Sequence, residues 1–142
     1  MVPRPVGEAK VLKKGRNVEQ SSATVMDHFL NPRNVGDLPN AHGVGRASNP
    51  QDGDTVRFAI QVKGGVIEAA RFKAQGCVAA IAGSSALTEL VQGKELEGAL
   101  SITKEDLAAA LDGLSERKQA CSLTCLEALR LAVEQCDPSL VK

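Results

Sequence analysis

The sequence predicts an α+β domain, in which a small antiparallel sheet of about three strands precedes helices that cover one of its faces. Residues 55–62 alternate between apolar and polar side chains, as a half-buried strand does. The Lys-Gly-Gly sequence at residues 63–65 predicts a hairpin turn into an antiparallel strand over residues 66–73. From Val78 onward the apolar spacing becomes helical, so the helices follow the sheet along the chain.

The composition limits the classes of partner. The 142 residues suit one domain, and 17 basic residues balance 17 acidic ones. The chain has no tryptophan or tyrosine, so a nucleic-acid partner, which needs a basic surface or stacking side chains, is not expected. A membrane is not expected either, because no apolar run approaches the roughly 20 residues of a membrane span.

We expect the domain to occupy residues 21–137, between two tails. Residues 1–20 are polar and basic with scattered prolines and glycines, which predicts a disordered tail. They lack the apolar stretch of a secretory signal, and a targeting segment is the alternative interpretation. Residues 138–142 form the expected C-terminal tail. Four cysteines without an export signal indicate reduced thiols and a cytoplasmic protein.

The first helix should begin after a capping serine at position 21 or 22 and end before Pro32. Residues 31–49 are rich in glycine, asparagine and proline, and we interpret them as a loop with a short strand over residues 44–47. In the second strand of the hairpin, strict alternation places Ile67 on the face opposite Phe72.

The helical part of the chain begins after Cys77 with small and apolar residues, which is typical of a helix buried on several sides. Gly93 ends that helix, and a short helical turn is expected over residues 96–100. Thr103 and Asp106 have the spacing of a capping box at the start of the next helix. The final helix should run from Ser115 to Gln135 with these side chains facing inward: Leu123, Leu126, Leu129 or Arg130, and Val133.

Cys77 is the strongest candidate functional residue by position. At the start of a helix, partial positive charge and unsatisfied N–H groups favour a thiolate, the nucleophilic and metal-binding form. The alternative is a small buried hydrophobic residue. Cys121, Cys125 and Cys136 share one face of the final helix. Cys136 lies too far along that helix to share an ion with Cys125, and both are expected to be packing residues, although Cys125 is also an additional thiol within reach of Cys121.

Asp52 and Asp54 flank a glycine just before the first strand of the hairpin. An ordinary turn explains this pattern, because Asx residues and glycine favour turns. The alternative is a pair of carboxylates that point the same way. Together with Cys77 and Cys121 they would form a corner suited to a soft or borderline metal.

Taken together, these segments resemble the U-type iron–sulfur cluster assembly scaffolds, the IscU and NifU N-terminal domain family. The likeness covers about residues 24–135. Its matching segments are Asp27-His28-Phe29, residues 31–36, Gly53-Asp54, residues 65–73, Gly76-Cys77, residues 80–82 and 84–85, residues 87–91 and 93–94, and Cys121-Ser122.

The resemblance implies a scaffold rather than an enzyme. Such a scaffold builds a transient [2Fe–2S] cluster on three cysteines and an aspartate with sulfur from a cysteine desulfurase, and passes it to apo iron–sulfur proteins. Some members hold zinc in the same site. An oxygen ligand should make the cluster easier to release than a full set of thiolates would.

This sequence departs from the family pattern at two site positions. Asp52 stands where the first cysteine is expected, and Ala120 stands where a histidine precedes the third cysteine. The predicted site is therefore Asp52, Asp54, Cys77 and Cys121, holding a [2Fe–2S] cluster or a single Zn²⁺ or Fe²⁺ ion. Residues 114–118 lack the prolines of the family's chaperone-recognition segment, so a specialised Hsp70-type partner is not expected.

Two other functions stay open from the sequence. In the first, Cys121 accepts a persulfide from a desulfurase and relays the sulfur without holding a cluster. In the second, the changed site no longer binds metal, and the fold serves as an interaction module.

Overall fold

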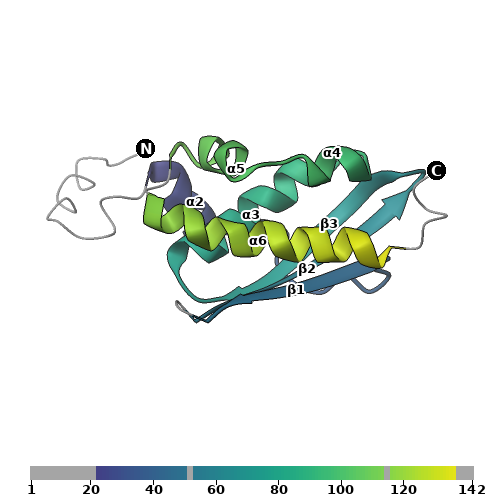
Figure 1. Ribbon diagram of the computed structural model, residues 1–142, viewed down its shortest axis with the longest axis horizontal. Coiled ribbons are helices and arrows are strands. Elements are labelled where there is room, and N and C mark those ends of the chain that lie inside the picture. Colours follow the sequence, from purple (N-terminus) through teal and green to yellow (C-terminus); the bar gives the residue numbers. More distant parts are fainter. Residues whose placement is uncertain (1–21, 51–52, 114–115, 137–142) are drawn as a thin grey trace, which may run out of the picture.

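The computed structural model describes residues 22–50, 53–113 and 116–136 (Figure 1). The predicted tails over residues 1–20 and 138–142, and Asp52, lie outside these described ranges. The elements within them are α2 (Ala23–Leu30), β1 (Gly43–Asn49), β2 (Asp54–Lys63), β3 (Val66–Gln75), α3 (Val78–Val91), α4 (Leu96–Leu100), α5 (Lys104–Ala110) and α6 (Glu116–Gln135).

The predicted α+β class is confirmed. Within the described ranges the sheet has three strands in the order β1-β2-β3, with both pairs antiparallel. The helices lie together on one side of the sheet (Figure 1), where α6 packs against β1 and β2 and α3 packs against β3. The core lies between these layers and includes Phe58, Ile60, Ile67 and Leu87. None of the described helices is long and apolar enough to cross a membrane.

The hairpin departs from strict alternation, which corrects the expectation for Ile67. The register between β2 and β3 shifts between Gln61 and Val62. A bulge of this kind changes the face that later side chains occupy. Ile67 is therefore fully buried in the same core as Phe72, rather than on the opposite face.

Strand β1 is longer than the short strand expected, and its glycines explain why a glycine-rich segment can form it. A Cβ atom on Gly45 would lie 2.0 Å from the carbonyl oxygen of Ala128 in α6, and one on Gly43 would lie 2.0 Å from that of Ala132. These distances are far below van der Waals contact. The glycines therefore allow α6 to lie almost directly on the backbone of β1.

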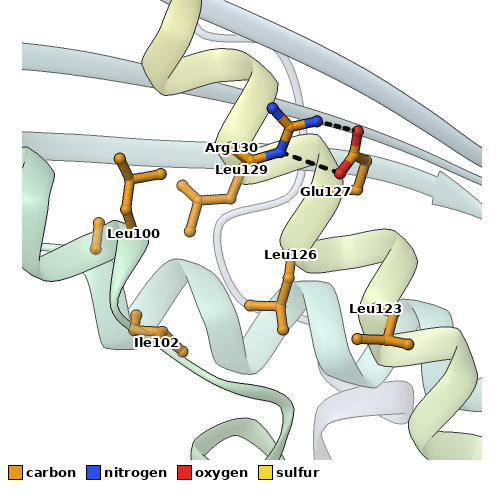
Figure 2. Close-up of a pocket in the computed structure, with 8 residues that line it drawn as sticks. Leu100, Ile102, Leu123, Leu126, Glu127, Leu129 and Arg130 are labelled. Atoms are coloured by element: carbon orange, nitrogen blue, oxygen red, sulfur yellow. Dashed lines mark hydrogen bonds and ion pairs between the residues drawn. The ribbon is translucent and has the colours of Figure 1, made fainter.

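The buried face of α6 consists mainly of small residues together with Leu129, which confirms the expectation for Leu129 and corrects the one for Leu123. That side chain is 49% exposed and points into a surface hollow of about 280 Å³ between α4 and α6, which Leu100 and Ile102 also line (Figure 2). A large side chain does not fit where the helix touches the glycines of β1. The buried residues of α6 are Cys121, Ser122, Thr124, Cys125, Ala128, Leu129 and Ala132, and Cys136 directly after the helix is buried too.

The helix starts follow the sequence signals. The Ser22 hydroxyl accepts a hydrogen bond from the Val25 N–H and so caps α2. Thr103 and Asp106 form both halves of the capping box at α5. Cys77 occupies the capping position of α3, but its side chain makes no capping hydrogen bond. The thiol of Cys77 is therefore left for other contacts.

Candidate metal centre

Asp54 begins β2 at the edge of the core. It pairs in register with Asn49 at the end of β1 and is 1% exposed. Burying a carboxyl group is unfavourable unless hydrogen bonds or charges satisfy it. Its oxygens face Cys77 at the start of α3, so the strand start and the helix start meet at this side chain.

Cys77 is fixed by its backbone. Its N–H donates a hydrogen bond of 2.9 Å to Oδ1 of Asp54. Its carbonyl oxygen accepts bonds from the N–H groups of Ala80 and Ile81, which closes the first turn of α3. Both backbone polar groups are thus engaged, and the half-buried thiol points toward the carboxyl group and α6.

Cys121 comes to the same point from α6. Its sulfur lies 3.1 Å from that of Cys77, and neither sulfur is part of a disulfide. The Cys77 sulfur also lies 3.6 Å from Oδ2 of Asp54. One ligand atom from each of the three residues lies within 4.8 Å of the others. We call this group the Asp54–Cys77–Cys121 corner.

The electrostatics of the corner favour the neutral thiol of Cys121 when no cation is present. Burial is the main cause that raises the pKa of the Cys121 thiol far above its ordinary value, and the nearby Cys77 thiol and Asp54 carboxyl raise it further. A thiolate in this position lacks a compensating positive charge. A metal ion supplies that charge, and coordination would displace the proton.

The backbone around the corner leaves room for the carboxyl group. Gly76 has φ +131°, and a Cβ atom there would lie 2.1 Å from Oδ1 of Asp54. Only glycine combines an unstrained positive φ with the absence of a Cβ atom. The Gly76-Cys77 pair that the sequence singled out therefore has a geometric role, because the glycine makes the space in which Asp54 meets Cys77.

The spacing of the corner fits a first-row metal. Two ligand atoms on one tetrahedral ion, each at about 2.0–2.3 Å from it, lie roughly 3.3–3.8 Å apart. The sulfur–oxygen separation of 3.6 Å falls in this range, and the two sulfurs at 3.1 Å need to move apart by only a fraction of an ångström. Thiolate sulfur and carboxylate oxygen suit zinc and iron.

The structure brings together three of the four residues of the predicted site, and the fourth, Asp52, lies outside the described ranges. Cys125, the additional thiol, sits one turn further along α6 and is fully buried. Its sulfur contacts the Ser84 hydroxyl at 3.3 Å and the Ala80 carbonyl at 3.5 Å. Burial raises its pKa to about 12. Cys125 therefore packs α6 against α3 and is not one of the residues of the corner.

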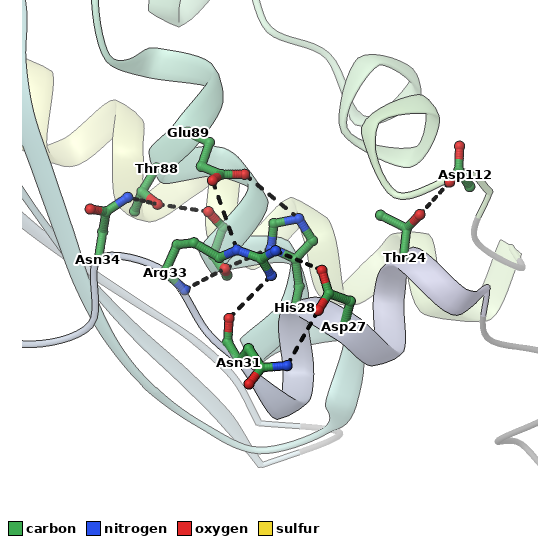
Figure 3. A network of polar contacts seen from close by, with 10 residues as sticks. Thr24, Asp27, His28, Asn31, Arg33, Asn34, Thr88, Glu89 and Asp112 are labelled. Atoms are coloured by element: carbon green, nitrogen blue, oxygen red, sulfur yellow. Dashed lines mark hydrogen bonds and ion pairs between the residues drawn. The ribbon is translucent and has the colours of Figure 1, made fainter. Parts of the chain in front are cut away.

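A polar network that the sequence did not predict ties α2 to α3 (Figure 3). His28 is 6% exposed, and its Nδ1 lies 2.7 Å from the Ser85 hydroxyl. The same hydroxyl accepts a hydrogen bond of 2.9 Å from the Arg33 N–H. We infer that the hydroxyl proton goes to Nδ1 and that Nε2 carries the ring proton toward Glu89, 3.7 Å away. The segments that match the family contain its residues, but no local pattern joins them, because the pairing links residues far apart in the sequence.

Comparisons with known proteins agree with the fold. A family model described as the NifU-like N terminal domain matches residues 20–138. The chain is 48% identical over 112 residues to the iron-sulfur cluster assembly scaffold protein IscU 1 of Archaeoglobus fulgidus, covering 79% of this chain and 73% of that protein. It is 49% identical over 112 residues to the scaffold protein IscU of Aquifex aeolicus, covering 78% of this chain and 71% of that protein.

Among solved structures, the fold is similar to that of the N-terminal part of a nitrogen-fixing NifU-like protein from Brucella abortus. The TM-score is 0.69 at 16% sequence identity, and the match covers 80% of this chain and 92% of that chain. This likeness supports the arrangement of the sheet and helices independently of the sequence matches.

Proposed function

The chain belongs to the family of NifU-like N-terminal domains, and we propose that it is an iron–sulfur cluster assembly scaffold or carrier. On this proposal it holds a labile [2Fe–2S] cluster, or a single Zn²⁺ or Fe²⁺ ion, on Asp52, Asp54, Cys77 and Cys121. The cluster is cargo, built with sulfur from a cysteine desulfurase and delivered to apo iron–sulfur proteins in the cytoplasm.

One observation carries the proposal: three ligand atoms from β2, α3 and α6 meet within 4.8 Å. Nothing in the packing of a small core requires a buried carboxyl group beside two thiols, and burying these groups costs free energy. An ion that binds all three groups would offset that cost. The convergence therefore supports a retained metal site over an interaction module that has lost one.

The ligand set supports release as much as binding. Two thiolates suit an iron–sulfur cluster, whereas carboxylate oxygens are harder donors that bind the cluster less firmly. Asp54 is tied to the Cys77 N–H through Oδ1 and keeps Oδ2 directed at the thiols. One oxygen can therefore hold the geometry while the other binds and lets go of the cargo.

The accessibility of the two thiols bears on the alternative of a sulfur acceptor. Cys121 is 4% exposed, and burial raises its pKa, so in this conformation it is a weak nucleophile toward a persulfide. Cys77 is the more accessible thiol. This difference favours ligation over sulfur relay as the role of Cys121.

Anaerobic reconstitution with Fe³⁺ and sulfide tests the proposal. We expect visible sulfur-to-iron charge-transfer absorption and bound iron in the unaltered chain, and loss of both in a Cys77→Ser/Cys121→Ser variant. A Cys136→Ser variant is the matched control, because it removes a buried thiol at the far end of α6. Equal iron and equal absorption in the double variant and the unaltered chain would contradict the proposal.

Metal analysis of the protein as purified separates the remaining possibilities. Zinc or iron that depends on Cys77 and Cys121 supports a metal site. A mass gain of one sulfur on Cys121 after incubation with a desulfurase and cysteine, without bound iron, supports sulfur relay instead. A protein with neither bound metal nor a sulfur adduct would support the interaction module.

A further inference from the structure

The face of the sheet away from the helices carries a row of cations in register. Arg46 of β1 is the register partner of Arg57 of β2, and Arg57 is the partner of Lys73 of β3. Val56 and Phe58, on either side of Arg57, are fully buried, so alternation directs Arg57 to the opposite face. Directly opposed side chains in a sheet have Cβ atoms about 4.5–5.5 Å apart. We call Arg46, Arg57 and Lys73 the basic row.

Like charges in direct opposition destabilise a sheet, and one carboxylate already offsets part of this repulsion. Asp37, in the loop before β1, places Oδ1 2.8 Å from Arg57 and Oδ2 3.2 Å from Lys73. The hydrogen bonds from Lys73 and Arg57 lower the pKa of Asp37. A single surface carboxylate thus bridges two neighbouring cations of the row.

Arg46 lies at the other end of the basic row. It is exposed, and no carboxylate among the described residues pairs with it. The basic row borders a shallow depression of about 560 Å³, which Thr55 and Gln75 also line. These two residues are chain neighbours of Asp54 and Gly76. The depression therefore extends from the unpaired cation toward the strand ends that carry the corner.

We propose that the basic row is a docking surface for an acidic segment of a partner protein. A partner carboxylate would bridge Arg46 and Arg57 as Asp37 bridges Arg57 and Lys73. A partner bound there would lie beside the corner without covering the thiols, which are on the helix side of the sheet. The proposal does not depend on what the corner holds, and its test needs no metal.

Charge and side-chain type favour an acidic partner segment over the chain's own residues 1–20 and over a nucleic acid. Residues 1–20 of the chain itself contain five cations, Arg4, Lys10, Lys13, Lys14 and Arg16, against two acids, Glu8 and Glu19, so the row would repel them. A nucleic acid would gain little stacking, because the chain has no tryptophan or tyrosine and the phenylalanines of these strands, Phe58 and Phe72, are buried. Carboxylates match both the charge and the bridging geometry that Asp37 already shows.

Fluorescence anisotropy with a labelled poly-glutamate peptide tests the proposal, with a poly-glutamine peptide as the uncharged control. We expect binding of the acidic peptide that weakens as salt rises. Arg46→Gln should weaken it about fivefold. Asp37→Asn should strengthen it, because that change frees Arg57 and Lys73. Lys94→Gln is the matched control, since it removes one exposed cation in the turn between α3 and α4.

Three outcomes would overturn the proposal. Equal effects of Arg46→Gln and Lys94→Gln would mean that the peptide senses only net charge. Weaker binding by Asp37→Asn would mean that the row is not the binding surface. Tighter binding of an oligothymidylate of the same charge than of poly-glutamate would assign the row to nucleic acid. Circular dichroism of each variant confirms that the exposed substitutions leave the fold intact.

Discussion

The backbone N–H of Cys77 donates a hydrogen bond of 2.9 Å to Oδ1 of Asp54, which joins the start of α3 to the start of β2. Because of this bond, the two oxygens of the carboxyl group have different roles. Oδ1 holds the helix start in place, and Oδ2 faces the Cys77 sulfur at 3.6 Å. The hydrogen bond therefore orients the carboxyl group toward the thiol, and such orientation reduces the ordering that ion binding must provide.

Gly76→Ala should disrupt the corner. The new Cβ atom would lie 2.1 Å from Oδ1 of Asp54, at a backbone φ of +131° that side chains rarely adopt. We expect the free energy of unfolding, measured by urea titration, to fall by about 3 kcal/mol. Iron retained after reconstitution should fall with it.

Gly64→Ala is the matched control for that change. Gly64 lies in the hairpin turn with φ +61°, and a Cβ atom there would have no other atom within 4 Å. The substitution should lower the free energy of unfolding by about 1 kcal/mol through backbone strain alone. It should leave iron retention unchanged. Equal losses of stability and iron in both variants would contradict the role assigned to the space at Gly76.

Ser85→Ala should destabilise the junction between α2 and α3. Its buried hydroxyl serves both the Arg33 N–H at 2.9 Å and Nδ1 of His28 at 2.7 Å. Removal leaves polar groups without partners, which should lower the free energy of unfolding by about 1–3 kcal/mol. Ser101→Ala, which removes an exposed hydroxyl bonded to the Glu97 carbonyl, should change it by about 0.5 kcal/mol or less.

The stability of the protein should fall as the pH is lowered through the range below 6.5 because of His28. Burial, followed by the charge of Arg33, lowers the pKa of His28 below 6.5. The folded protein therefore favours the neutral ring. The full contribution of this ring to the free energy of unfolding is present above pH 6.5, the ordinary pKa of histidine. As the pH falls below that value, the unfolded chain binds a proton more readily than the folded chain, so the free energy of unfolding decreases.

Urea midpoints across that range measure the effect. A His28→Gln variant should lose the dependence in this range, because it has no ring to protonate. Asp27 and Asp37, whose pKa values are lowered by their cationic partners, act only at more acidic pH. An unchanged pH profile in His28→Gln would assign the dependence to another group.

The sequence predicted the elements better than it predicted which of their faces are buried. Caps at Ser22 and Thr103 and the hairpin glycines act through neighbours in the chain, so local patterns contain them. The inward face of α6 depends instead on how closely the helix approaches the glycines of β1. No pattern within α6 reveals that approach, and the larger Leu123 was therefore expected inside although it is exposed.

The corner also combines features that local patterns reveal with features that depend on tertiary packing. Single positions suggested Cys77, and the family resemblance selected Asp54 and Cys121. Their separations of 3.1 and 3.6 Å depend on the crossing of α6 over the sheet and on the space at Gly76. The His28 network was missed for this reason as well, because Ser85 lies on a helix far along the chain.

Asp52→Cys should make the cargo harder to release. This position holds an aspartate where the family resemblance places a thiolate, and thiolate sulfur binds iron–sulfur clusters more firmly than carboxylate oxygen does. After reconstitution, we expect the visible absorption of the variant to decay several-fold more slowly in the presence of an iron chelator. Glu97→Cys adds a thiol on the surface of α4 and should leave the decay rate unchanged. Faster or equal decay in Asp52→Cys would mean that the side chain at position 52 does not hold the cargo.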